Sequence, residues 1–175
     1  MLFRSKMDVK LNGLVQSLVN RPPHGTPGTA VFFTSDPEIA PTALLHSLKH
    51  YKVLHENNLI LTIRTTDTPT TDDAKKMRIN KLSGNFTSII ACIGYMETPD
   101  VPKLLELAKK DGVETNAMTT SFFLSRRSVQ SSSEGRIAAW QNKLFILMAR
   151  NADDASHYFH LPPDRVVEIG TQITI

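Results

Sequence analysis

The sequence predicts an α/β domain: a mixed, mainly parallel sheet flanked by about three helices, with one β-hairpin. Two short apolar runs, 29–34 and 59–65, have the composition of strands buried on both faces, as the strands of a parallel sheet are. A helical pattern over about residues 41–54 separates them, so the three segments form a βαβ unit with a right-handed crossover. Strand-like segments 77–82 and 86–94 follow one another across a short turn, which is the pattern of a hairpin.

Composition sets the class of protein. The 175 residues suit one domain or one domain with an arm, and the hydrophobic content of 41% is ordinary for a soluble chain. A single cysteine, Cys92, excludes an internal disulfide framework. The net charge of +3 comes from scattered basic residues, so we expect no nucleic-acid partner. The sequence has neither a signal peptide nor an apolar run near the ~20 residues needed to span a bilayer, and we expect this chain alone to be soluble.

The amino-terminal part, 1–28, is predicted to be an arm and a linker, and 29–175 the domain. Apolar residues recur in the arm at the spacing of a short amphipathic helix: Leu11, Leu14, Val15 and Leu18. Three prolines and two glycines in residues 21–28 end that helix, because neither residue type continues one readily.

The helix predicted over about 41–54 has two different faces. Pro41 suits its first turn. Its inner stripe consists of Leu44, Leu45, Leu48 and Tyr51. Its outer side, called the basic face below, consists of His46, Lys49, His50 and Lys52.

The basic face has three interpretations. Exposed charges on a helix are most often solvated and nothing more. The same charges could form a docking face for an anionic partner. His46 and His50, at positions i and i+4, have the spacing of a zinc-binding pair, but no third ligand lies adjacent and Lys49 would repel a cation. We therefore predict no metal site.

The second half of the chain carries further helix and strand signals. Asp100 is expected to cap a helix over 101–111, with Lys109 and Lys110 in its last turn and Gly112 at its end. Residues 119–125 are a strand candidate.

The last third is predicted to contain a serine-rich loop at 128–135, a long helix over about 136–152 and a final strand at 165–175. Strict alternation in the final strand predicts that one set of its side chains faces the core: Val167, Ile169, Thr171, Ile173 and Ile175.

No catalytic constellation or cofactor motif is recognisable, so we expect no enzyme activity and no cofactor. Cys92 lies in an apolar run, where a core residue is expected rather than a nucleophile. A nucleophile elbow, a Walker loop and a dinucleotide fingerprint are all missing from the sequence. Loop 35–38 is acidic and would repel phosphate, but α/β sheets bind ligands beyond the carboxyl ends of their strands, so a nucleotide there remains an alternative.

Several blocks, in a fixed order, resemble the cytosolic C-terminal domain of the Kup family of bacterial potassium uptake transporters. The blocks are 27–34, 44–56, 94–102, 121–126, 150–152 and 165–172, and the resemblance covers nearly all of residues 22–175. The sequence departs from the family's usual residues at Tyr51, at Asn57-Asn58 and at Asp164.

The resemblance implies a cytosolic regulatory or assembly domain of a proton-coupled potassium ion symporter. It implies a place at the cytoplasmic face of the bacterial inner membrane, after the membrane portion of the same transporter, and a possible homodimer. Some members are thought to sense a cyclic dinucleotide through this region. The alternatives are thus a nucleotide-sensing module acting on the transporter and a stand-alone small-molecule-binding domain.

Overall fold

A computed structural model describes residues 9–73, 76–116, 118–130 and 155–174. Its helices are α1 (Leu11–Asn20), α2 (Thr42–His50), α3 (Val101–Lys110), the short α5 (Ala155–Tyr158) and the 3-10 turn η2 (Pro163–Arg165). Its strands are β1 (His24–Phe33), β2 (Val53–Thr66), β3 (Met77–Lys81), β4 (Phe86–Gly94), β5 (Thr120–Gln130) and β6 (Val166–Thr174).

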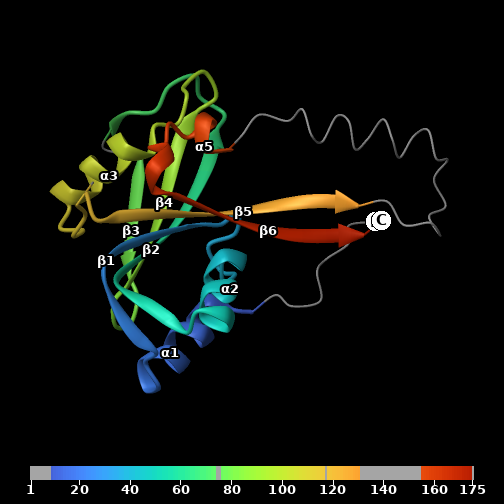
Figure 1. The fold of residues 1–175 in the computed structure, drawn as a ribbon. Coiled ribbons are helices and arrows are strands. Elements are labelled where there is room, and N and C mark those ends of the chain that lie inside the picture. Colours follow the sequence, from blue (N-terminus) through green and yellow to red (C-terminus); the bar gives the residue numbers. More distant parts are fainter. Residues whose placement is uncertain (1–8, 74–75, 117, 131–154, 175) are drawn as a thin grey trace.

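The six strands form one sheet in the order β3-β4-β2-β1-β5-β6. Every neighbouring pair is parallel except β3 and β4, which form the predicted antiparallel hairpin. The α/β class, the mainly parallel sheet and the hairpin are therefore confirmed. In Figure 1 the ends of β5 and β6 extend to the right, beyond the rest of the sheet.

Helices lie on both faces of the sheet, and each face has its own core. One core joins α3 to inward side chains of β1, β2 and β4, among them Val31, Leu61 and Ile89. The other joins α1 and α2 to the alternate positions, among them Phe32 and Ile60. Because successive side chains of a strand point to opposite faces, the continuous apolar run of β1 supplies both cores.

β1 begins at His24, within the segment predicted to be a linker, which was expected to reach residue 28. The two glycines and Pro27 do not end the strand, because a bulge accommodates Pro27 and Gly28. The pairing of β1 with β2 shifts register between Thr26 and Thr29. Gly28 has a positive φ of 101°, and a Cβ atom there would lie 2.7 Å from the carbonyl oxygen of Thr119. Only glycine fits this position without strain.

α2 ends at His50, four residues before the predicted end, and β2 begins at Val53. The amides of Tyr51 and Lys52 both donate to the carbonyl of Ser47, and Lys52 has a positive φ of 56°, which turns the chain out of the helix. Tyr51 was predicted to face the core but is 66% exposed, because it follows the last helical turn. Ser47 is buried in its place.

α3 begins and ends as the sequence predicts. The carboxylate of Asp100 accepts a hydrogen bond from the amide of Lys103 at 3.1 Å and thereby caps the helix. Gly112, just beyond the helix, has a φ of 83°, a conformation that glycine adopts without penalty.

The carboxyl-terminal strand forms as predicted, but its side chains are placed differently. β6 is an outer strand of the sheet and pairs with β5 alone. Val167 is 39% exposed, so the prediction that it faces the core is wrong, whereas Ile169 packs against the α1–α2 core. Residues 128–130 belong to β5 and not to a loop. The predicted helix at 136–152, the rest of the serine-rich loop and Ile175 lie outside the described residues.

The bulge gives a stability prediction. Replacing Gly28 by alanine should lower the free energy of unfolding by at least about 2 kcal/mol, because a side chain at φ 101° is strained and its Cβ would meet the Thr119 carbonyl. Gly25→Ala is the matched control, since nothing lies within 4 Å of a Cβ there. Urea unfolding of both variants tests this, and equal midpoints would contradict it.

Candidate functional site

The sheet has a topological switch point between β1 and β5. From β1 the chain passes through α2 to β2 on one side, while β5 lies on the other side of β1. Open α/β sheets bind ligands in the crevice beyond the carboxyl ends of such strands. A cavity of about 500 Å³ lies at this point, within the volume range of small-molecule sites.

The end of β1, the start of α2 and β5 all contribute to the wall of this cavity. Its apolar part includes Phe33 and Phe159, whose rings stack with centroids 5.3 Å apart. Its polar part includes the side chains of Thr34, Ser35 and Ser125. The wall can therefore offer an apolar surface for a planar ring and hydroxyl groups for hydrogen bonds.

The loop after β1 makes the cavity mouth acidic. Asp36 lies in the cavity wall, and its carboxylate accepts a hydrogen bond from the amide of Glu38 at 3.0 Å. The hydroxyl of Thr34 donates to the carbonyl of Asp36 at 3.0 Å and holds the turn. These contacts fix the loop, and its negative charge favours a neutral or cationic group at this mouth over a phosphate.

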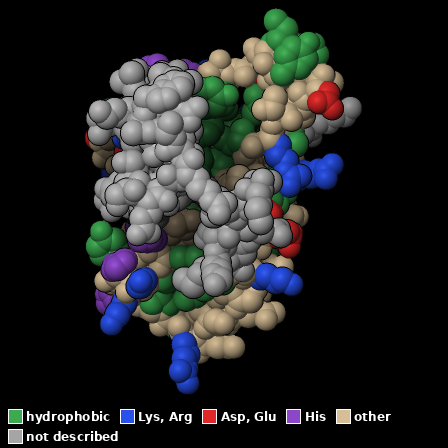
Figure 2. All heavy atoms as spheres, turned by 90° about the vertical axis from the view of Figure 1, so that its right-hand side faces the viewer, with side chains coloured by type: hydrophobic (Ala, Val, Ile, Leu, Met, Phe, Trp, Pro, Cys, Tyr) green, Lys and Arg blue, Asp and Glu red, His purple; other side chains and the backbone are tan. Residues whose placement is uncertain are grey.

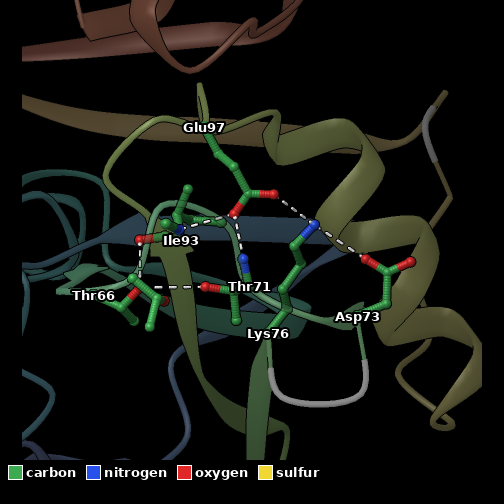
Figure 3. A network of polar contacts seen from close by, with 8 residues as sticks. Thr66, Thr71, Asp73, Lys76, Ile93 and Glu97 are labelled. Atoms are coloured by element: carbon green, nitrogen blue, oxygen red, sulfur yellow. Dashed lines mark hydrogen bonds and ion pairs between the residues drawn. The ribbon is translucent and has the colours of Figure 1, made fainter.

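A second polar cluster lies beyond the carboxyl ends of β2 and β4 and is centred on Glu97 (Figure 3). One carboxylate oxygen accepts hydrogen bonds from the amides of Gly94 at 2.8 Å and Thr71 at 3.1 Å. The other oxygen lies 3.1 Å from the ammonium of Lys76, which also contacts Asp73 at 3.0 Å. Glu97 thereby joins the loop after β4 to the loop after β2.

The Glu97 cluster is tight and electrostatically matched. Gly94 fits there because a Cβ atom would overlap the backbone of Pro69 and Thr70. The hydrogen bond from the Gly94 amide, helped by Lys76, lowers the pKa of Glu97. Hydrogen bonds to Asp73 and then Glu97 raise the pKa of Lys76. Both charged forms are stabilised, so the cluster holds the loops together at neutral pH.

The predicted basic face lies on the surface, as expected. His50, Lys49 and Lys52 are exposed, and His46 is half-buried with its ring centroid 5.5 Å from that of His50. The lower left of Figure 2 shows histidine side chains next to lysine or arginine side chains on the visible surface. Lys49, in the last turn of α2, also complements the negative end of the helix dipole.

The described residues contain no group of three or more histidine, cysteine or acidic side chains that could hold a metal ion. Cys92 is half-buried, more exposed than the core position expected from the sequence. Partial burial lowers the pKa of His55, whose ring lies edge-on to Phe123 at 5.7 Å.

Sequence reasoning missed the role of Glu97. Its only sequence signal was its place between Gly94 and the helix cap Asp100. These residues belong to block 94–102, one of the blocks that carry the family resemblance. The partners Thr71 and Lys76 come from another loop, and only the parallel pairing of β2 with β4 brings them within reach. The loop after β1, where a nucleotide was kept as an alternative, contributes Ser35 and Asp36 to the cavity wall.

Comparison with known proteins covers almost the whole chain. A family model described as the C-terminal domain of K+ potassium transporters matches residues 27–175. The chain is 53% identical over 170 residues to a probable potassium transport system protein Kup 2 of Rhodopseudomonas palustris. It is 51% identical over 170 residues to a Kup 1 of Bradyrhizobium diazoefficiens and to a Kup of Brucella anthropi. Each match covers 97% of this chain and 26–27% of the relative.

The chain therefore spans about a quarter of the length of the relatives that it matches. No solved structure matches it. None of the helices in the described part of the chain is long and apolar enough to cross a membrane.

The Glu97 cluster predicts a pH dependence of stability. A carboxylate whose pKa is lower in the folded than in the unfolded state stabilises the fold above its unfolded pKa, and that stabilisation is lost as the pH falls through the folded pKa. Glu97→Gln should therefore be less stable than the parent at neutral pH, and the difference should shrink below the ordinary glutamate pKa of 4.5.

Urea unfolding of both proteins across the acidic range measures this difference. Glu106→Gln, at an exposed position on α3, is the matched control and should follow the parent. A Glu97→Gln curve parallel to the parent at every pH would contradict the assignment.

Proposed function

The chain belongs to the family of K+ potassium transporter C-terminal domains, and from this we propose that it is the cytosolic regulatory domain of a proton-coupled potassium ion uptake transporter. In this proposal the domain lies at the cytoplasmic face of the bacterial inner membrane. It acts on the membrane portion of the same protein by shifting the balance between transport conformations. A domain can do so only if it binds one of those conformations better than another.

The observation that carries the proposal is an exposed basic face on a domain that matches the C-terminal part of much longer potassium transport proteins. Collinear identity to the terminal quarter of potassium transport proteins supports a role beside a much longer chain. On this domain Lys49, His50 and Lys52 are exposed and none of them forms an ion pair that the structure records. Charges without a structural partner leave the fold nearly untouched when removed, so they are available for contact with an anionic surface.

This gives a transport prediction. In the full-length transporter, the double substitution Lys49→Ala, Lys52→Ala should change the rate of potassium uptake while the amount of protein in the membrane stays the same. The reason is that the two charges contribute to docking and not to folding, so each should change the stability of the domain by less than ~0.5 kcal/mol. Uptake by cells that lack other potassium transporters measures the effect.

The control is Arg64→Ala, Arg78→Ala, which removes the same charge from exposed positions near the opposite end of the sheet. Parent-like uptake in the Lys49–Lys52 variant would mean that the basic face is only solvated. If the Lys49–Lys52 variant changes the oligomeric state of the transporter, the basic face has a role in assembly instead.

The cavity at the switch point favours a second candidate, a sensor of a small molecule such as a nucleotide. The stacked Phe33 and Phe159 offer a surface for a base, and hydroxyls of Thr34 and Ser125 suit a sugar. A ligand that binds only the folded domain raises its melting temperature by mass action. The acidic mouth at Asp36 disfavours phosphates close to that loop.

A thermal-shift assay distinguishes the two candidates. If the domain is a sensor, one member of a panel of nucleosides and nucleotides should raise the melting temperature of the parent. The rise should vanish in Ser35→Trp, whose side chain would fill the cavity mouth, and persist in Ser83→Trp on the turn between β3 and β4. No shift with any member would remove this candidate and leave the docking role untouched.

A further inference from the structure

The positive charge of this domain is concentrated at one of the two ends of its sheet. β1, β2, β4 and β5 run parallel, so their starts share one end of the sheet, called the amino end, and their finishes share the other, called the carboxyl end. α2 and α3 run back from the carboxyl end to the amino end. The last turns of both helices therefore lie with the strand starts.

The amino end is basic. Arg21 precedes β1, Lys49 and Lys52 precede β2, Lys81 precedes the turn into β4, and Lys109 and Lys110 precede β5. The carboxylates at this end are fewer: Glu56, Asp111 and Glu114. The strand starts at the amino end lie side by side. His24 of β1 pairs with Val53 of β2, and the side chain of Asn85, just before β4, donates to the carbonyl of His55 in β2 at 2.7 Å. The surface at this end is therefore continuous. The lower part of the face in Figure 2 shows lysine or arginine side chains at several separate places.

The carboxyl end carries a more even balance of charge. The loop after β1 carries Asp36 and Glu38. The carboxylates of Glu97 and Asp100 are paired with the ammonium groups of Lys76 and Lys103. Arg64 and Arg78 are exposed near this end as well. The switch-point cavity opens here.

We infer that the amino end of the sheet docks on an anionic lipid surface, with the carboxyl end and its cavity turned away from the membrane. This inference deepens the proposed function and rests on it for the presence of a membrane nearby. Each lysine or arginine close to an anionic leaflet contributes about 1 kcal/mol, and the excess of cations at the amino end orients the domain.

A lipid surface fits the amino end better than an acidic protein does, because of how its groups are spread. The cations come from several separate segments across the whole end of the sheet rather than from one groove. Large apolar side chains stand among them: Val19 is 47%, Tyr51 66% and Met118 71% exposed. Exposed apolar side chains occur at the carboxyl end too, for example Tyr95, so charge selects the end that faces the lipid. An aromatic side chain flanked by lysines is typical of groups that lie at a membrane interface.

Flotation of the 175-residue chain with vesicles tests the inference. The parent should bind vesicles of phosphatidylcholine mixed with phosphatidylglycerol, should not bind phosphatidylcholine alone, and should be released by salt. Lys49→Ala, Lys52→Ala should weaken binding about 30-fold, since two charges at about 1 kcal/mol each correspond to that factor. Arg64→Ala, Arg78→Ala should bind as the parent does.

Equal binding by both double variants, equal binding to both vesicle types, or no binding at low salt would each overturn the inference. A melting curve of each variant confirms that it is folded. The comparison of the two vesicle types uses the parent protein alone, so it does not depend on the folding of any variant. If uptake by the full transporter still depends on Lys49 and Lys52 while vesicle binding fails, the regulatory role stands and the partner is a protein surface instead.

Discussion

Burial of β1 on both of its faces is the constraint on which the rest of this structure depends. Val31 and Phe32 are almost completely inaccessible to solvent, yet they point into different cores. A strand buried in this way needs a helical layer on each side and parallel neighbours, and α1, α2 and α3 supply the layers. The crossover connections then fix which loops share an end of the sheet. Both the switch-point cavity and the concentration of positive charge at one end of the sheet follow from that arrangement.

Most of the architecture could be predicted from local pattern, because alternating or continuous apolar runs, caps and turn residues act over short range. The hairpin, the Asp100 cap and the strand at the carboxyl terminus are examples. The errors arose where backbone that is distant in the sequence decides the local conformation. Pro27 and Gly28 look like a linker, but the carbonyl of Thr119 and the neighbouring β2 hold them in a bulge. Tyr51 continues the helical pattern, but the helix ends one residue before it.

The basic face and the Glu97 cluster also differ in how far the sequence could predict them. The basic face is a property of one helix, so its residues could be named from the sequence, whereas its occupant could not. The Glu97 cluster depends on loops that meet only through the β2–β4 pairing, and no sequence spacing indicates it. Its role is to fix the loops at the carboxyl end. That leaves the two ends of the domain with separate tasks in the proposed function: contact at the basic amino end and ligand access at the carboxyl end.

Hydrogen exchange of the full-length transporter in lipid bilayers tests the orientation most directly. The account predicts that anionic lipid, compared with zwitterionic lipid, slows exchange in segments at the amino end, around residues 50–53 and in the β3–β4 turn at 82–85. Exchange in the loops after β1 and β4 should stay the same. Equal exchange in both bilayers at the amino end, or slowing at the carboxyl end, would contradict it.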